Sequence, residues 1–341
     1  MKSSPRIAVL GAGAMGSRIG AHLFEAGYAV VLYDSWKDHV AEIQRNGLRI
    51  VHEHSARTLK IKAANRPLPG EVYDYVLLLT KSGQTEEALA GFRDIIGPDT
   101  HVVSLQNGIA GIEILPRYIP KERILVGVTT YSSDLLGPGA VQIGGSGITY
   151  LSRLSGGSSP AVDTLEAIFN AAGFQTVVSE DAMQVIWEKL AFNASINPVT
   201  ALTRLNAGEA GTHPLGIELM SSIVGEVAAV GHRLGINVRT DEVMNQLRRA
   251  CEPEACSDHL PSMLQDVLKG RKTEIEALNG AVIRLADDFG MDIPYNRALY
   301  QMVKMLDEIK GLSLSCFRFI DSCTCETSKV EAPSSRRLPT E

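Results

Sequence analysis

The hydrophobic and polar positions follow two different patterns along this chain of 341 residues. From residue 5 to about 178, short runs of Val, Ile and Leu alternate with stretches of helical periodicity, which predicts strands alternating with helices. From Ser179 onward, the apolar positions recur almost only at helical spacing. We therefore predict an α/β domain over 1–178, an all-helical domain over 179–312 and a mobile, Ser-, Pro- and charge-rich tail over 313–341.

The first domain is predicted to hold a sheet that is buried on both faces. Residues 75–80 form a continuous apolar run, as such a strand requires. Further strands are expected at 7–10, 30–33, 101–105, 124–128 and 175–178, and glycine-punctuated strands at 140–143 and 148–151 should form a hairpin-like extension. In the second domain, helices are expected over 180–196, 216–234, 241–249, 261–269, 274–289 and 295–309.

The chain opens with the arrangement that a dinucleotide site needs. An apolar run leads into a turn with glycine at its first, third and sixth positions, and a second apolar run ends in an acid 18 residues after the last glycine. Such glycines allow a tight bend, a close approach of backbone to pyrophosphate, and packing of helix on strand. The helix N–H groups then face the phosphates. We therefore predict a cofactor site at Gly11, Ala12, Gly13, Ala14, Met15, Gly16 and Asp34; the alternative is a glycine-rich turn without a ligand.

Composition excludes several other classes of protein. The net charge is −6 and no basic stripe appears, which argues against a nucleic-acid partner. No signal peptide is visible, and the uninterrupted apolar runs are shorter than the roughly 18 residues that span a bilayer. The five cysteines are odd in number, cluster late and lack zinc-ligand spacing, so we expect no disulfide framework and no metal site. A cytoplasmic protein with no membrane partner is expected.

One helix of the second domain carries an unusual polar row. Lys189, Asn193 and Asn197 follow one another at four-residue intervals, which places an ammonium and two amides on one face. The residues around them are mostly apolar, and Asn is a weak helix former. The row therefore suggests the polar wall of a buried pocket. A solvated stripe, or Asn side chains that cap other elements, is the alternative.

Further candidates lie in three other segments. Lys81 and Asn107 follow two apolar strands, and ligands of open α/β sheets lie at the carboxyl ends of strands. The alternative for Asn107, followed by glycine, is an ordinary turn. Ser262 and Glu274 belong to the helical domain, where Glu274 is expected to begin a helix, with Thr273 as its N-cap. By itself, that second segment indicates only a well-capped helix.

Together these motifs resemble the ketopantoate reductase family, over about residues 5–312. Any single marker is weak, but six occur in order and at fitting spacing. They are Gly11-x-Gly13-x-x-Gly16, Thr80-Lys81, Gln106-Asn107-Gly108, Trp187-x-Lys189-Leu190 with Asn193 and Ile196-Asn197-Pro198, Ser262-Met263-x-x-Asp266, and Thr273-Glu274-Ile275 with Asn279-Gly280.

The resemblance implies a Rossmann domain, a helical domain and a substrate cleft between them. It implies NAD(P)H-dependent reduction of a 2-keto acid, most favourably 2-dehydropantoate to D-pantoate. Lys189 would be the general acid, and Glu274 would bind the substrate hydroxyl. Asn107, Asn193, Asn197 and Ser262 would hold the substrate, while Asn107 and Lys81 would also line the cofactor side. Independently, a cation that can donate a proton suits the alkoxide charge that hydride addition creates.

One residue departs from the family pattern and leaves two questions open. NADPH-dependent members usually carry a basic residue just after the second strand, whereas Asp34 here would bind the ribose hydroxyls of NADH and repel a 2′-phosphate. Lys37 could still reach a phosphate. We therefore predict NADH preference, with NADPH as the alternative, and a D-2-hydroxyacid dehydrogenase acting on another bulky 2-keto acid as the second candidate. A non-catalytic dinucleotide sensor is the remote third. The oligomeric state stays open, with a homodimer as one option.

Overall fold

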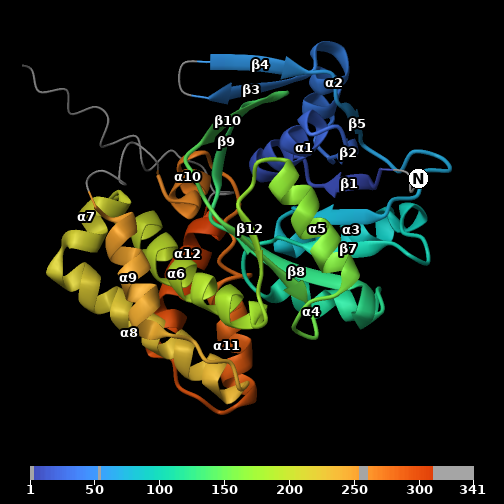
Figure 1. The fold of residues 1–341 in the computed structure, drawn as a ribbon. Coiled ribbons are helices and arrows are strands. Elements are labelled where there is room, and N and C mark those ends of the chain that lie inside the picture. The colour runs from blue at the N-terminus through green and yellow to red at the C-terminus, as the bar shows by residue number, and fades with distance from the viewer. Residues whose placement is uncertain (1–3, 53–54, 253–259, 310–341) are drawn as a thin grey trace, which may run out of the picture.

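The computed structural model of the protein describes residues 4–52, 55–252 and 260–309. Figure 1 shows the strands gathered in the N-terminal part of the chain and the later helices packed to one side of them. The tail predicted over 313–341 lies outside the described residues, as do Cys256, Cys316, Cys323 and Cys325.

An eight-stranded sheet forms the centre of the N-terminal domain within the described residues. Its strands are β1 (Arg6–Leu10), β2 (Ala29–Tyr33), β5 (Lys62–Ala64), β6 (Tyr75–Leu78), β7 (His101–Ser104), β8 (Ile124–Thr129), β11 (Thr149–Arg153) and β12 (Thr176–Val178). The spatial order is β12-β11-β8-β7-β6-β1-β2-β5. All neighbouring pairs in the part β8-β7-β6-β1-β2-β5 are parallel, whereas β11 pairs antiparallel with β8. The order β5-β2-β1-β6-β7-β8 is that of a doubly wound dinucleotide-binding sheet, whose strand order reverses between β1 and β6.

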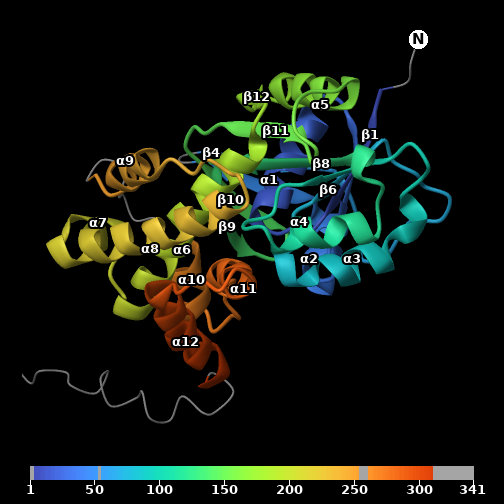
Figure 2. The same cartoon turned by 90° about the horizontal axis from the view of Figure 1, so that it is seen from below.

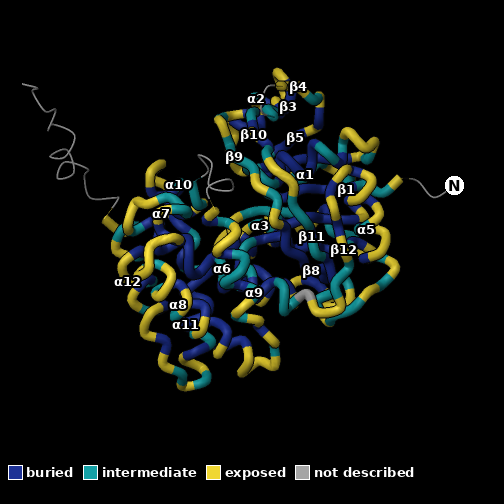
Figure 3. The backbone as a smooth tube through the Cα atoms, turned by 60° about the vertical axis from the view of Figure 1, so that its left-hand side comes forward, coloured by how far each residue is buried: buried dark blue, intermediate teal, exposed yellow. Residues whose placement is uncertain are grey.

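Alternating side chains of the sheet belong to two separate cores. Along β1, Ile7 and Val9 join the core beneath α1 (Ala14–Glu25) and α5 (Pro160–Ala171). Ala8 and Leu10 join the opposite core, together with α3 (Thr85–Gly91) and α4 (Ala110–Ile114). Figure 2 shows α5 and the α3–α4 pair on opposite sides of the sheet, and Figure 3 shows buried segments of the sheet, in dark blue, at β1 and β8. The second core continues into the helical domain, so the two domains share apolar contacts.

A smaller sheet beside α1 was not predicted. Its strands are β3 (Leu48–His52), β4 (Ser55–Leu59), β9 (Ser132–Gly137) and β10 (Ala140–Gly144), in the order β4-β3-β10-β9. The expected hairpin of 140–143 with 148–151 is therefore wrong. β10 pairs with β9 and β3, while β11 returns to the main sheet. The local hairpin does not form because β10 pairs instead with β3, a strand about 90 residues earlier in the chain. α2 (Lys37–Asn46) follows β2 of the main sheet and precedes β3 of the smaller one. It contacts β5 of the main sheet and β3 of the smaller sheet.

The C-terminal domain is built around one long central helix. Its helices are α6 (Ala182–Thr203), α7 (Ala207–Thr212), α8 (Pro214–Arg233), α9 (Thr240–Ala250), α10 (Ser262–Leu268), α11 (Asn279–Asp288) and α12 (Pro294–Ile309). α6 packs against α8, α9, α10 and α12, and also touches β8 and β11 of the other domain. By length and composition α8 could cross a membrane, but here it packs on α6 in this helical domain. The predicted helix over 274–289 begins only at Asn279, so the expectation that Glu274 starts it is wrong.

Candidate functional site

The glycine turn after β1 forms an open cradle at the start of α1. Gly11 has a φ of +96°, and the N–H groups of Gly11 and Ala12 both donate to the carbonyl of Tyr33, at 2.8 and 3.2 Å. These two groups therefore fix the turn. A Cβ on Gly16 would lie 1.9 Å from the carbonyl oxygen of Gly11, whereas a Cβ on Gly13 would meet nothing within 4 Å. The space above Gly13 is where a phosphate would sit.

The first turn of α1 is suited to an anion. Its N-cap is Gly13, and no side chain of the described residues caps it. The N–H groups at Ala14 and Met15 begin the helix and have no carbonyl within the helix to bind. Partial positive charge gathers at such an end, which favours a pyrophosphate. This segment therefore fits the dinucleotide that the sequence predicts.

Asp34 lies at the end of β2, beside this cradle. Its Oδ1 accepts the Trp36 N–H at 2.8 Å, and its backbone carbonyl accepts the Asn65 amide at 2.9 Å. Among the described residues, no hydrogen bond is assigned to the other carboxylate oxygen. That oxygen is available to a ribose hydroxyl. Lys37 is exposed at the start of α2, next to Trp36.

The loops after β6 and β7 are tied together by one buried amide. The Gln106 amide nitrogen donates to the Thr80 carbonyl at 2.9 Å and to the Thr85 hydroxyl at 2.9 Å. The Asn107 carbonyl accepts the Ser82 hydroxyl at 2.9 Å. These bonds fix the two loops that carry Lys81 and Asn107. In the sequence, Gln106 stood out only as part of a family motif; in the structure it positions those two loops.

Lys189 reaches from α6 to the same edge of the sheet. Its Nζ donates to the carbonyl of Thr129, the last residue of β8. Removal from water lowers the pKa of Lys189 to about 8, and the nearby charge of Glu274 only partly offsets this effect. The helical domain thus delivers a cation with a near-neutral pKa to the carboxyl ends of the parallel strands.

Glu274 lies in the turn before α11, and its charge acts on the pKa of Lys189. Burial raises the pKa of Glu274, and the neighbouring charge of Asp266 acts in the same direction. The Lys81 charge and hydrogen bonds from the Asn107 side chain and the Ser82 backbone act against that rise. Glu274 is therefore held by both domains rather than by a helix dipole.

Thr273 does not cap a helix as expected. Its hydroxyl donates to Asp307 of α12 at 2.6 Å. A Cβ on Gly108 would come within 2.4 Å of the carbonyl oxygen of Ala277, which shows how closely this segment meets the loop after β7. Contacts between the domains thus hold 274–278 as a turn and override the local helical signal.

The two amides of the polar row are buried. Asn193 and Asn197 expose 9% and 5% of their surface, which excludes the solvated stripe as their environment. The Ser262 hydroxyl at the start of α10 donates to Oδ1 of Asn197 at 3.5 Å, a long bond that a ligand could replace. These three side chains supply neutral hydrogen-bonding groups to the wall that also carries Lys189.

Lys81 is paired across the domains. Its Nζ lies 2.8 Å from Oδ2 of Asp266 and donates to the Lys272 carbonyl at 2.9 Å. Arg271 binds the other oxygen of Asp266 at 2.9 Å. Asp266 is buried, where an unpaired charge would be costly, and these two cations neutralise it. The sequence marked Asp266 only as part of a family motif, and the pairing with Lys81 could not be read from it.

Arg18 is a further residue that the sequence analysis missed. It is buried on α1 and donates to the carbonyls of Ser132, Gly144 (2.7 Å) and Gly145 (3.3 Å). Its guanidinium also lies 4.7 Å from the centre of the Tyr131 ring. Arg18 thereby fastens the β9–β10 segment to α1. A charged residue within an otherwise apolar helix face was the available signal.

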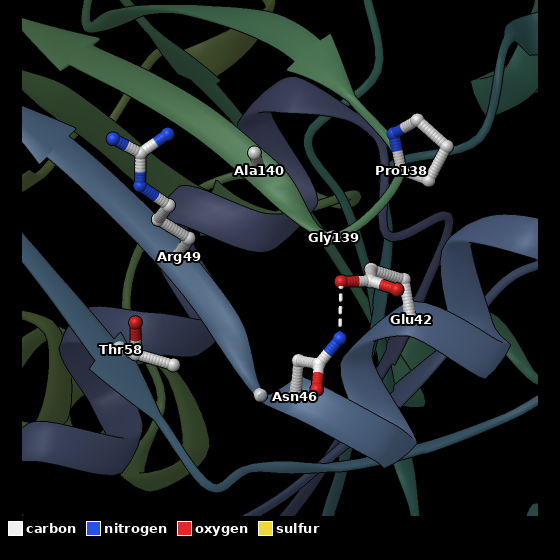
Figure 4. Close-up of a pocket in the computed structure, with 8 residues that line it drawn as sticks. Glu42, Asn46, Arg49, Thr58, Pro138, Gly139 and Ala140 are labelled. Carbon is white, nitrogen blue, oxygen red and sulfur yellow. Dashed lines mark hydrogen bonds between the residues drawn. The ribbon is translucent and has the colours of Figure 1, made fainter.

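The hollow in Figure 4 is not part of this site. It lies between α2, β3, β4 and the β9–β10 turn, and it is lined by Glu42, Asn46, Gly47, Arg49, Thr58, Pro138, Gly139 and Ala140. Two of these lining residues bond one another, since the Asn46 amide donates to Glu42 at 2.7 Å. None of the predicted site residues lines it. No cluster of three metal-ligating side chains occurs among the described residues.

Two family profiles match most of the chain. The profile described as "Ketopantoate reductase PanE/ApbA" matches residues 7–156, and the one described as "Ketopantoate reductase PanE/ApbA C terminal" matches residues 181–307. The 2-dehydropantoate 2-reductase of Streptococcus pyogenes serotype M3 is 30% identical over 305 residues, covering 89% of this chain and 98% of the relative. The enzyme of the same name from Archaeoglobus fulgidus is 33% identical over 300 residues, covering 88% and 97%.

Solved structures share the whole fold. D-mandelate dehydrogenase, in a ternary structure with NADH and anilino(oxo)acetate, is 31% identical with a TM-score of 0.86, covering 90% of this chain and all of that one. A PanE/ApbA family ketopantoate reductase from Ralstonia eutropha is 28% identical with a TM-score of 0.81, covering 90% and 99%. The family profiles and the solved structures match both domains of this chain. The chain belongs to the ketopantoate reductase family.

Proposed function

We propose that this protein reduces a 2-keto acid with NADH or NADPH, and that its preferred substrate is 2-dehydropantoate, which it converts to D-pantoate. The observation that carries the proposal is the position of Lys189, whose Nζ donates to the Thr129 carbonyl at the carboxyl end of β8, where the charge of Glu274 also acts on its pKa. Relatives about 30% identical over nearly their whole length are named 2-dehydropantoate 2-reductase, which supports this choice.

Lys189 is the proton donor in this proposal. A bound nicotinamide supplies the hydride to the keto carbon. The Nζ proton of Lys189 passes to the carbonyl oxygen, which would otherwise become an alkoxide, and leaves a neutral amine that solvent reprotonates. The pKa of Lys189, lowered to about 8, makes it a stronger acid than an ordinary lysine while it remains largely protonated at pH 7. Thr129 orients the amine through its carbonyl.

The other polar groups hold the substrate. Asn193, Asn197 and Ser262 offer hydrogen bonds to the carboxylate and carbonyl of a 2-keto acid. Glu274, itself held by Asn107, accepts a hydrogen bond from a substrate hydroxyl. 2-Dehydropantoate has a terminal hydroxyl for this purpose, and that is why Glu274 favours it over an unsubstituted branched keto acid.

We propose NADH as the preferred cofactor. The cradle at Gly13 fits the pyrophosphate of either dinucleotide. At Asp34, one carboxylate oxygen stands next to the place of the ribose, where it suits two hydroxyls and repels a phosphate.

A D-2-hydroxyacid dehydrogenase acting on a bulky or aromatic 2-keto acid is the second candidate. The observations that favour it are Asp34 and the similarity, with a TM-score of 0.86, to D-mandelate dehydrogenase solved with NADH. Both candidates share the roles given to Lys189 and the cofactor cradle. They differ in the substrate side chain, and therefore in what Glu274 binds.

Initial rates of NADH and NADPH oxidation decide between these candidates. They are measured with 2-dehydropantoate and with a panel of branched and aromatic 2-keto acids. The highest kcat/KM with 2-dehydropantoate is the expected result. A better aromatic or branched substrate would move the assignment to a D-2-hydroxyacid dehydrogenase, and cofactor binding without any turnover would revive the sensor hypothesis.

We further propose a cytoplasmic enzyme that acts on small molecules without a nucleic-acid or membrane partner. The negative net charge and the packing of α8 on α6 support this proposal. The homodimer stays a prediction, which light scattering on the purified protein tests directly.

A further inference from the structure

α6 contains a proline in its last third, where a helix loses one of its own hydrogen bonds. Pro198 has no N–H, so it cannot donate to the carbonyl of Ala194, four residues earlier. Ala194 is fully buried, so bulk water does not reach this carbonyl and a donor has to come from elsewhere. Ala194 also directly follows Asn193 and lies in the same turn as Asn197. The gap in the helix ladder is therefore in the wall of the proposed substrate site.

Asn279 supplies the missing donor from another helix. Its Nδ2 donates to the Ala194 carbonyl at 3.0 Å and to Oδ1 of Asn296 at 3.0 Å, so both amide protons are used. Asn279 has no exposed surface. It is the first residue of α11, five positions after Glu274, and the proposed function gives it no role.

Asn279 is itself held in a fixed orientation. Asn296, on α12, is also fully buried, and its Nδ2 donates to Oε2 of Glu226 at 2.7 Å. The backbone N–H of Asn296 donates to the same oxygen at 2.9 Å. The carboxylate of Glu226 on α8 thus anchors Asn296, and Asn296 orients Asn279 toward Ala194. Such a connected network fixes side-chain position within a core, and in it the Oδ1 of Asn279 is the buried oxygen that has no hydrogen-bond partner among the described residues.

We propose that Asn279 is a positioning residue of the reaction: by satisfying the Ala194 carbonyl that Pro198 leaves unpaired, it sets α6, with Lys189, Asn193 and Asn197, in register with the Glu274 segment. The inference rests on the proposed function for its catalytic consequence, but the pairing of Asn279 with the proline gap does not depend on any substrate. Asparagine is suited to this place because its amide nitrogen carries two donors. Aspartate would turn an acceptor toward the carbonyl.

A double-mutant cycle tests the pairing. Pro198→Ala restores an N–H that can donate to the Ala194 carbonyl within the helix, so the protein should then need Asn279 less. Asn279→Ala alone should lower the melting temperature clearly, whereas the same change in the Pro198→Ala background should lower it much less. Ser195→Ala is the matched control, because the buried Ser195 hydroxyl bonds the Phe192 carbonyl at 2.8 Å instead. Its effect should be the same in both backgrounds. Equal losses for Asn279→Ala in both backgrounds would overturn the proposal.

Kinetics test the positioning role. Asn279→Ala should lower kcat by about 10- to 100-fold with little change in the KM for NADH, because the cofactor cradle is in the other domain. The alkaline limb of the pH–rate profile should move away from its wild-type position, since Lys189 would sit differently against Thr129 and Glu274. Pro198→Ala should restore most of both. A folded Asn279→Ala enzyme with wild-type kcat and an unmoved profile would refute the role.

Asn279→Leu provides the measurement if Asn279→Ala does not fold. It keeps the approximate shape of the side chain and removes the donor without adding a charge, so it should show the same rescue by Pro198→Ala, and absence of rescue would contradict the proposal. The two proposals can fail separately. If the wild type reduces no 2-keto acid, the proposed function fails, while the melting-temperature cycle still decides whether Asn279 and Pro198 are coupled.

Discussion

The ammonium of Lys81 and the carboxylate of Asp266 lie 2.8 Å apart and join the two domains beside Glu274. Both charges act on the pKa of Glu274, and they act in opposite directions: Lys81 lowers it, and Asp266 raises it. Burial raises it as well and is the largest cause. The ion pair therefore tunes the protonation of Glu274 as well as linking the domains.

Substitutions at this pair should shift the acidic limb of the pH–rate profile in opposite directions. If ionised Glu274 binds the substrate, activity rises as pH increases through its raised pKa. Asp266→Asn removes a negative neighbour, so the limb should move to lower pH. Lys81→Met removes a positive neighbour, so the limb should move to higher pH. The measurement is kcat/KM for the keto acid against pH at saturating cofactor, and shifts in the same direction would contradict this account.

Lys189 should control the alkaline limb. Its protonated form donates the proton, and its pKa is lowered to about 8. Above the acidic limb set by Glu274, reduction rates should therefore stay level up to that value and fall as pH rises through it. Lys189→Met should lower kcat by about 100- to 10,000-fold at every pH and leave the profile without this limb. NADH binding, followed by fluorescence, serves as the control and should be nearly unchanged. A surviving alkaline limb in the variant would assign it to another group.

Two glycines of the cofactor turn should respond differently to the same substitution. A Cβ on Gly16 would collide with the Gly11 carbonyl, whereas a Cβ on Gly13 would enter open space. Gly16→Ala should therefore lower the melting temperature of the protein without ligand. Gly13→Ala should keep that temperature but weaken NADH binding, because the methyl group occupies the place of the pyrophosphate. If Gly13→Ala bound NADH like the wild type, the phosphate would have to sit elsewhere.

Asp34 should set the choice of cofactor. Its carboxylate can accept hydrogen bonds from the ribose of NADH, and bonds to a charged group are worth about 1.5–3 kcal/mol. Asp34→Ser should therefore raise the ratio of kcat/KM for NADPH to that for NADH by about 10- to 100-fold. Asp38→Ser is the control: it removes an exposed carboxylate from the second residue of α2 and should leave the ratio unchanged. If the wild-type protein preferred NADPH, the role given to Asp34 would be wrong.

The parts of the fold that follow local rules could be predicted from the sequence. The parallel strands, the glycine turn and the polar row of α6 each depend on spacing within a short segment. Placing Lys81 and Asn107 at strand ends was enough to bring them to one edge of the sheet, where Glu274 now bonds Asn107.

Features that depend on distant partners could not be read in this way. β10 looks like half of a local hairpin, yet it pairs with β3, far earlier in the chain. Glu274 has the sequence context of a helix start, but contacts with Ser82 and Asn107 from the other domain hold it in a turn. Asp266 and Asn279 are both polar residues on short helices or at helix starts. Only tertiary structure shows that one meets Lys81 and the other meets the carbonyl that Pro198 leaves open.

A second buried charge, next to Lys189 on α6, should matter for stability more than for chemistry. Glu188 is 3% exposed, and its two oxygens bind Nε and a terminal nitrogen of Arg239 at 2.6 and 2.9 Å. Arg239→Met should lower the free energy of unfolding by about 2 kcal/mol at pH 7, because it leaves that buried carboxylate without a cation. Glu188→Gln in the same variant should recover part of the loss.

The pH dependence identifies the cause of this loss. Hydrogen bonds from Arg239 and Gln184 hold the pKa of Glu188 below its ordinary value, although burial opposes them. A carboxyl whose folded pKa is lowered contributes stability above its unfolded pKa and loses it as pH falls through the folded one. The difference between wild type and Arg239→Met in urea unfolding should therefore be largest near neutral pH and shrink in acid. Arg297→Met, which breaks the exposed pair of Arg297 with Asp287, should cost less than about 1 kcal/mol. If Arg239→Met cost no more than this control at pH 7, the buried pair would not be what fixes α6 to the segment before α9.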